Sequence, residues 1–384
     1  MKISKNLNRI KFFGKTKLSI FPVGFGAGDF FWNSNISEKD KIGLINYAAS
    51  NGVNFFDTAQ EYGNGESEKL IGKALKSDRE RMFIATKFSP QNHNYKNVIK
   101  SCESSLKNLK TDYIDLYQIH WPNPSIALRK TLSALIELYN QGKIRAIGIC
   151  NYGIEETKII SKFLDKIPLS SIQMEYNLFE RTVEENGILN YCRKNKISFF
   201  SYSPLDQGQI NNFSSKQKKL LLSIGKKHNK SIHQVMLNFI ISKEQIIPII
   251  RTTSINHLLE NIKSVYFNLE ESDLNEIEKI FPITYQHIPV SSIKISLNGE
   301  WNHKVYTTME QAINNNLNFV PSPTDLSKSI KKYGSLKPVR LVKISEKDKK
   351  YDFELVAGRV RYWAWRIAFG DNCPPIPAYI RRNN

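Results

Sequence analysis

The stretch that decides the fold is Asn54-Phe55-Phe56-Asp57-Thr58-Ala59-Gln60-Glu61-Tyr62-Gly63. Its apolar start predicts a short buried strand, which ends in a turn that carries the carboxylate of Asp57 and, five residues later, the phenol of Tyr62. Two later apolar segments end in the ionisable residues Lys87 and His120. Because the carboxyl ends of parallel strands meet at one edge of a sheet, we expect these four side chains to lie together.

The chain on both sides of this stretch alternates short apolar segments with segments of helical periodicity. Strands are expected at residues 20–24, 54–56, 83–86, 114–119, 144–149, 171–175, 198–202 and 246–250. Helices are expected at residues 38–50, 66–76, 96–109, 126–141, 155–164, 184–195, 215–241, 255–263 and 271–280. This alternation is the pattern of a (β/α)8 TIM barrel, which we assign to residues 1–283.

The pattern changes after Phe281-Pro282. A chain of 384 residues suits one large domain followed by a small one. Residues 284–384 predict such a small α+β domain. Its strands are expected at 288–293, 338–344, 353–356 and 376–380, and its helices at 323–333 and 360–369.

The composition limits the classes of function. The formal charge of +19 is compatible with nucleic-acid binding, but the lysines are spread over the outer faces of the expected helices, which favours an ordinary solvated surface. The four cysteines lie far apart without a CxxC pair, so neither a zinc site nor a disulfide framework is indicated. No apolar run approaches the roughly 20 residues that span a bilayer. We therefore expect a cytoplasmic protein without a membrane partner.

The four ionisable residues together suit proton donation to an oxygen atom. Taken singly, Asp57 is explained as a turn cap, Lys87 as a surface lysine and His120 as a packed ring. Together they are harder to explain by structure alone. A phenol with a pKa of about 10 is a poor acid at neutral pH. An adjacent lysine cation lowers that pKa, and a carboxylate keeps the lysine charged. A neutral histidine can donate a hydrogen bond to a carbonyl oxygen as negative charge develops there.

Residues 1–281 resemble an aldo-keto reductase over essentially their whole length. The resemblance is carried, in order, by Phe56-Asp57-Thr58-Ala59 with Tyr62-Gly63, Thr86-Lys87, Ile119-His120-Trp121-Pro122, Gly142-Lys143-Ile144-Arg145-Ala146-Ile147-Gly148, Gln173-Met174-Glu175-Tyr176-Asn177, Tyr202-Ser203-Pro204-Leu205 with Gly208, and Glu260-Asn261. It implies a reductase that uses a nicotinamide cofactor. Its catalytic tetrad would be Asp57, Tyr62, Lys87 and His120, with Tyr62 as the general acid.

The same resemblance implies the residues that bind the cofactor. Asn151 and Gln173 would bind the carboxamide, and Tyr202 would stack on the nicotinamide ring. The remaining contacts would come from Ser203 and Leu205 near the pyrophosphate, from Glu260 and Asn261 at the adenine, and from the segment that contains Arg251, Thr252, Ser254 and His257.

Two departures from the family pattern concern the cofactor. Cys150 stands where the family usually has serine. Arg251 occupies a usual glycine position, and Ser254 occupies a usual basic position at the 2′-phosphate. NADP is expected as the cofactor, with NAD as the alternative.

Aromatic residues surround the expected substrate position. Phe30, Phe31 and Trp32 follow the first expected strand, and Trp121 follows His120. They form either an aromatic wall of the substrate pocket or a cover over the barrel mouth. Sugars often pack on aromatic faces, so the expected substrate is a small carbonyl compound, including a sugar.

Residues 286–384 resemble the ParB/sulfiredoxin-like fold. The resemblance is carried by Ile288-Pro289-Val290-Ser291-Ser292-Ile293, Lys337-Pro338-Val339, Leu355-Val356-Ala357-Gly358-Arg359-Val360-Arg361-Tyr362 and Ile376-Pro377-Ala378. In that family a Gly-x-x-Arg turn opens a helix and binds phosphate groups, and Gly358 and Arg361 match it. Arg359 replaces the Glu of ParB proteins and the reactive Cys of sulfiredoxins. A phosphate or nucleotide ligand is therefore expected at Gly358, Arg359 and Arg361.

Three functions are open at this point. The leading one is an NAD(P)H-dependent reductase of an aldehyde, ketone or sugar carbonyl with an appended phosphate-binding domain. The second is a non-catalytic, cofactor-sensing scaffold that regulates the second domain, which the complete tetrad disfavours. The third is DNA or nucleotide binding through residues 284–384.

Overall fold

The computed structural model describes residues 11–16, 18–28, 36–208, 210, 213–283, 285–295, 305–334, 337–344 and 351–381. The chain divides into two compact units. One comprises Met1–Trp121, Arg129–Gln209 and Ser215–Phe281, and the other comprises Pro122–Leu128, Ile210–Ser214 and Pro282–Asn384. Within the described ranges, no helix is long and apolar enough to cross a membrane.

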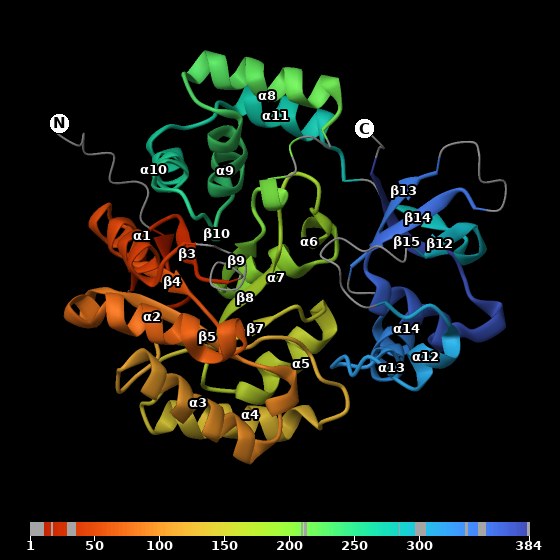
Figure 1. Cartoon of the computed structure of the whole chain (residues 1–384), viewed down its shortest axis with the longest axis horizontal. Helices are drawn as coiled ribbons and strands as arrows, with labels where there is room; N and C mark the ends of the chain where they lie inside the picture. Colours follow the sequence, from red (N-terminus) through yellow and green to blue (C-terminus); the bar gives the residue numbers. More distant parts are fainter. Residues whose placement is uncertain are drawn as a thin grey trace. The chain divides into compact units, whose positions relative to one another are not determined.

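The first unit is a closed barrel of parallel strands, as the sequence predicts (Figure 1). The strands follow one another around the barrel in chain order, and β10 closes it by pairing with both β9 and β3. They are β3 (Gly24–Gly26), β4 (Phe55–Asp57), β5 (Phe83–Phe88), β6 (Leu116–Ile119), β7 (Ile147–Cys150), β8 (Leu169–Glu175), β9 (Ser198–Tyr202) and β10 (Ile246–Ile250). Their side chains are almost all buried, because helices cover the outside and aromatic and aliphatic residues fill the inside.

The helices of this unit surround the barrel (Figure 1). Most are amphipathic, so that one face packs on the strands. They are α1 (Glu38–Ser50), α2 (Glu66–Ala74), α3 (Tyr95–Leu109), α4 (Leu128–Asn140), α5 (Ile154–Leu164), α6 (Thr182–Glu185), α7 (Ile188–Asn195), α8 (Ser215–His228), α9 (Ile232–Ser242), α10 (Ile255–Lys263) and α11 (Glu271–Ile280).

A hairpin covers the end of the barrel where the strands begin. Its strands are β1 (Lys11–Phe12) and β2 (Ser19–Ile20), which pair antiparallel. The ring of Phe13 in its turn packs against Phe83 and Phe200, with centroid distances of 4.6 and 6.1 Å. The hairpin therefore closes one end of the barrel and leaves the carboxyl ends of the strands as the accessible edge.

Three expected elements of the first unit differ from the structure in extent or continuity. The first barrel strand is Gly24–Gly26 and not residues 20–24, because Ile20 pairs with Lys11 in the hairpin. At Gly24 a Cβ would lie 2.4 Å from the Phe55 ring, so the close approach of the two strands there needs glycine. The expected helix 215–241 is two helices, since Asn229 has a left-handed φ of 52° and Ser231 caps α9 in a capping box with Gln234. The expected helix 184–195 is likewise split into α6 and α7.

The second unit contains a mixed sheet with the strand order β11-β15-β13-β14-β12. The strands are β11 (Gln286–Ile288), β12 (Ile293–Ile295), β13 (Val339–Lys343), β14 (Phe353–Ala357) and β15 (Ile376–Arg381). The expected strand 288–293 is divided by a tight turn at Val290–Ser292, whose Ser292 amide donates to the Pro289 carbonyl.

Helices of the second unit complete its core. They are α12 (Met309–Ile313), which the sequence analysis did not predict, α13 (Pro323–Tyr333) and α14 (Arg359–Phe369). Trp363 of α14 is buried, and its indole donates a 3.0 Å hydrogen bond to the Tyr306 carbonyl. The unit therefore has an apolar core of its own.

Candidate active site

A buried ion pair lies at the carboxyl edge of the barrel. Asp57 is the last residue of β4, and Lys87 comes from the neighbouring strand β5. The Lys87 ammonium donates to Asp57 Oδ1 at 2.6 Å and to the Thr58 carbonyl at 2.8 Å. Burial by itself would lower the pKa of Lys87, but the Asp57 carboxylate and, to a smaller extent, Tyr62 outweigh it and raise that pKa above its ordinary value. The net direction of this shift favours the charged form of Lys87.

Two glutamines hold the second oxygen of Asp57. Gln173 of β8 donates to Asp57 Oδ2 at 2.9 Å, and Gln118 of β6 donates at 3.5 Å. Gln118 in turn accepts a hydrogen bond from Ser171 at 3.3 Å and lies 3.8 Å from the Cys150 sulfur. Gln173 is among the site residues predicted from the sequence, whereas Gln118 is not, because its position inside a buried strand gave no separate signal.

A left-handed turn carries Tyr62 from β4 into α2. Gly65 has a φ of 90°, a conformation that favours glycine, and Asn64 also has a positive φ. The turn brings the Tyr62 ring over the ion pair, with the Lys87 ammonium 5.2 Å from the ring centroid. The phenol ring and the lysine cation therefore lie close together, as predicted from the sequence, and their roles as acid and activator stay a prediction.

His120 follows β6 at the same edge. Its ring meets the Tyr62 ring edge-on, at a centroid distance of 5.6 Å. Its Nδ1 lies 2.8 Å from Oε2 of Glu61. Burial lowers the pKa of His120, and Glu61 acts in the opposite direction. Glu61 is inside the stretch that decides the fold, but no role is predicted for it from the sequence.

These groups open into a cavity of about 620 Å³, a size typical of ligand sites. It lies entirely in the first unit. Its lining brings together most of the predicted site residues: Asp57, Tyr62, His120, Trp121, Asn151, Gln173, Tyr202, Ser203, Leu205, Arg251, Thr252, His257, Glu260 and Asn261. Lys87 lies behind Asp57, and Ser254 caps the first turn of α10 by accepting from the His257 amide. Phe30 and Trp32 lie outside the described residues.

The inner part of the cavity has amide groups and a phenol in contact. Asn151, with a left-handed φ of 63°, donates to the His120 carbonyl at 3.2 Å and accepts from the Tyr202 hydroxyl at 2.9 Å. An amide has two N–H groups and two lone pairs on its oxygen, so Asn151 and Gln173 each keep capacity for a ligand amide. This donor set fits a carboxamide-bearing ring that lies against Tyr202.

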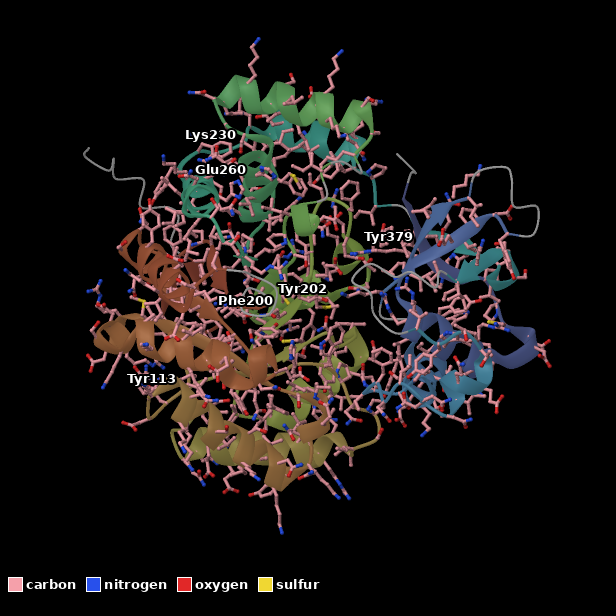
Figure 2. The ribbon with its side chains drawn as sticks, viewed as in Figure 1. Tyr113, Phe200, Tyr202, Lys230, Glu260 and Tyr379 are labelled. Carbon is pink, nitrogen blue, oxygen red and sulfur yellow. The ribbon has the colours of Figure 1, made fainter. Side chains whose placement is uncertain are left out.

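The outer part of the cavity is formed by β10, the loop that follows it, and α10. Arg251 and Thr252 follow β10, and Glu260 and Asn261 come from α10. Figure 2 shows Tyr202 near the middle of the barrel and Glu260 on α10. His233 also lines the cavity, with its Nδ1 3.8 Å from Glu260 Oε1, and was not predicted. The residues thus suit an elongated ligand with a charged part near Arg251.

In the second unit, the predicted phosphate-binding residues lie at the start of α14. Gly358 precedes the helix, and Arg359 begins it. Arg361 Nη1 donates to the carbonyls of Lys337 and Pro338 at 2.9 and 2.8 Å, so one of its nitrogens binds the backbone before β13. A phosphate at these residues stays a prediction.

Comparison with known proteins identifies the family to which the barrel is similar. Residues 22–281 match the profile of the Aldo/keto reductase family. The aldo-keto reductase YhdN of Bacillus subtilis (strain 168) is 40% identical over 208 residues, which are 51% of this chain and 61% of YhdN. This chain therefore spans less than two thirds of that relative.

Solved structures agree in fold. The thermostable aldo-keto reductase Tm1743, crystallised with the inhibitor epalrestat, has a TM-score of 0.67 and 35% identity, and the likeness covers 71% of this chain and 99% of Tm1743. An aldo/keto reductase from Klebsiella pneumoniae, in complex with NADP and acetate, has a TM-score of 0.65 and 23% identity over 72% of this chain and 96% of its own. The predicted class, an NAD(P)-dependent oxidoreductase, is confirmed for the barrel.

Proposed function

The chain belongs to the aldo/keto reductase family, and we propose that it reduces the carbonyl group of a small aldehyde, ketone or sugar with NADPH. The observation that carries the proposal is the contact of Lys87 with Asp57 beneath the Tyr62 ring, at the inner end of a cavity. A buried, charged lysine beside a phenol has a clear chemical use in proton donation.

The four residues divide the work on the substrate oxygen. When bound, a nicotinamide cofactor would supply the hydride for the carbonyl carbon. Tyr62 would donate its hydroxyl proton to the carbonyl oxygen. Lys87 stabilises the phenolate that remains, and Asp57 keeps Lys87 charged and in place. His120 contacts the same oxygen from the side, because its ring is adjacent to Tyr62.

The cofactor residues follow from the lining of the cavity. Asn151 and Gln173 would bind the carboxamide, and Tyr202 would lie against the ring. Ser203 and Leu205 would hold the pyrophosphate, and Glu260 and Asn261 would face the adenine. Arg251, with Thr252, Ser254 and His257 nearby, would bind the 2′-phosphate, which makes NADP the preferred cofactor over NAD.

The substrate enters beside Trp121, which lines the cavity and is 39% exposed. An exposed indole next to the catalytic histidine offers an apolar face for the substrate.

A cofactor titration followed by a carbonyl panel tests this function. Quenching of the intrinsic fluorescence would be measured with NADPH and NADH, using the chain's five tryptophans and its tyrosines as the probe. NADPH oxidation would then be followed with aliphatic, aromatic and 2-oxo aldehydes, ketones and aldoses. Saturable NADPH binding with turnover of at least one class supports the proposal. Binding without turnover of any class would favour the cofactor-sensing scaffold, and no binding would reject both.

For residues 284–384 we propose a ParB/sulfiredoxin-like domain that binds a phosphate or nucleotide at Gly358, Arg359 and Arg361. Its support is the glycine-led start of α14 with two arginines in its first turn. Binding of ATP, GTP and inorganic phosphate to the full chain and to Arg359→Ala would test it. Salt-sensitive DNA binding that Arg359→Ala weakens would favour the DNA-binding alternative instead. We place the protein in the cytoplasm, in line with its four free cysteines.

A further inference from the structure

Glu61 places a carboxylate directly behind the histidine that faces the substrate. Oε2 of Glu61 lies 2.8 Å from Nδ1 of His120, and the Nδ1 atom is fully buried. The contact has the distance of an ion pair, and its geometry departs from that of a regular hydrogen bond. The Glu61 side chain is 37% exposed, so the carboxylate also reaches solvent.

This contact decides where the proton sits on the imidazole ring. A neutral histidine carries one proton, on Nδ1 or on Nε2. A lone pair on Nδ1 would face the negative charge of Glu61 at 2.8 Å, so the proton is favoured on Nδ1. Nε2 is then the nitrogen left for the substrate, and in the neutral ring it is an acceptor and not a donor.

We propose that Glu61 is a positioning residue that holds His120 in the Nδ1–H tautomer. As a result, the charged form of the His120 ring supports carbonyl reduction and the neutral form supports alcohol oxidation. This inference rests on the proposed function. In reduction, the carbonyl oxygen needs a donor, and only the charged ring offers Nε2–H. In oxidation, the alcohol hydroxyl needs an acceptor, and the neutral ring offers its Nε2 lone pair.

The groups around the ring set the balance between these two forms. Glu61 and Asp57 favour the charged ring, whereas burial and the Lys87 cation disfavour it. Tyr62 meets the ring edge-on and lies on the same turn as Glu61. Because burial is the largest influence, the pKa of His120 is lowered from its ordinary value. Reduction should therefore be fastest on the acid side, and oxidation should gain as the pH rises.

The first test observes the ring without turnover. Nitrogen-15 NMR of the full chain, with the His120 signals identified from His120→Asn, would give the tautomer and the titration of the ring. In the wild type we expect the Nδ1–H form. In Glu61→Gln we expect a mixture of tautomers and a lower His120 pKa, because the carboxylate that raises it is gone. The matched control is Glu66→Gln, since Glu66 is an exposed carboxylate of the same segment that pairs with Lys69.

The second test is the pH profile of kcat in both directions. In Glu61→Gln the kcat of reduction should decline less steeply as the pH rises, because the neutral ring then also populates its Nε2–H form. Near pH 6 the kcat of reduction should be about threefold to tenfold lower than in the wild type. KM for NADPH should change little, and Glu66→Gln should keep the wild-type profile. An unchanged His120 tautomer and profile in Glu61→Gln would overturn the inference. If the wild-type protein turns over no carbonyl compound, the proposed function is rejected. The NMR result would still decide whether Glu61 fixes the tautomer of His120.

Discussion

Two buried aspartates, Asp57 and Asp115, lie at opposite ends of the barrel strands and have different surroundings. Asp115 precedes β6 and binds Arg79 at 2.7 Å, Arg145 at 3.2 Å and the Ile84 amide at 3.0 Å. Both arginines also stack on the Tyr113 ring, at 4.0 and 3.4 Å from its centroid. Asp115 thus links both arginines, which share the Tyr113 ring, to the strand of Ile84, and none of these residues lines the cavity at the carboxyl edge.

Asp57, at the other end, binds one cation, the Lys87 ammonium, which lies 5.2 Å from the centroid of the Tyr62 ring. Its amide partners Gln173 and Gln118 complete its acceptor sites, while Lys87 extends toward Tyr62. The comparison indicates what separates a structural ion pair, such as that of Asp115, from a candidate catalytic one, such as that of Asp57. The candidate catalytic pair adjoins a third ionisable group and an open cavity. Breaking the first cluster should cost stability, and breaking the second should cost rate.

The largest effect is expected for Lys87→Met. The phenolate of Tyr62 would lose its nearby cation, so kcat should fall by about 10³-fold. NADPH affinity should stay within about threefold, since Lys87 lies behind the cavity wall. Steady-state kinetics and the fluorescence titration check both values. Lys69→Met removes an exposed lysine and serves as the control; a rate loss in the control equal to that in Lys87→Met would contradict the account.

Asp115→Asn should have a large effect on stability and a small one on rate. The substitution would leave the largely buried guanidinium of Arg79 without its carboxylate partner. Breaking such a pair lowers the free energy of unfolding by about 3 kcal/mol. Urea unfolding followed by the change in intrinsic fluorescence measures the loss. The kcat of the folded variant should match the wild type. A fall in kcat comparable with that of Lys87→Met would show that the two ends of the barrel are not separable in this way.

The smallest effect is expected for Cys150→Ser, which restores the usual residue of the family. Burial raises the pKa of the Cys150 thiol, so it stays neutral, and its contact with Gln118 is long at 3.8 Å. A serine hydroxyl is a stronger donor, so NADPH affinity should rise by up to about threefold. The Kd from the titration decides this, with Cys373→Ser in the second unit as the control. Weaker binding would mean that the site is adapted to the thiol.

Sequence alone predicted the barrel because most of its strands are continuous apolar runs between helices. It failed at β3, where Gly24–Gly26 has no side-chain pattern and is specified by the Phe55 ring packed against it. It also joined α8 and α9, because the break depends on a left-handed asparagine and a capping box. These features depend on contacts and local backbone conformation that periodicity does not record.

For the site, the sequence predicted the residues that end strands or belong to family motifs. It missed Gln118 and Glu61, whose roles depend on which atoms the closed barrel brings within reach of Asp57 and His120. In the second unit, α13 and most strands were predicted, whereas α12 was not, since five residues carry too little helical periodicity.

The most direct test of the central claim compares wild type with Tyr62→Phe. NADPH oxidation and alcohol formation would be measured together with the best carbonyl substrate, and Tyr266→Phe, which alters an exposed tyrosine, is the control. The account predicts that Tyr62→Phe loses at least about 10²-fold in kcat and binds NADPH as the wild type does. Wild-type turnover in Tyr62→Phe would contradict the assignment of the proton donor and, with it, the chemical role of the carboxyl edge.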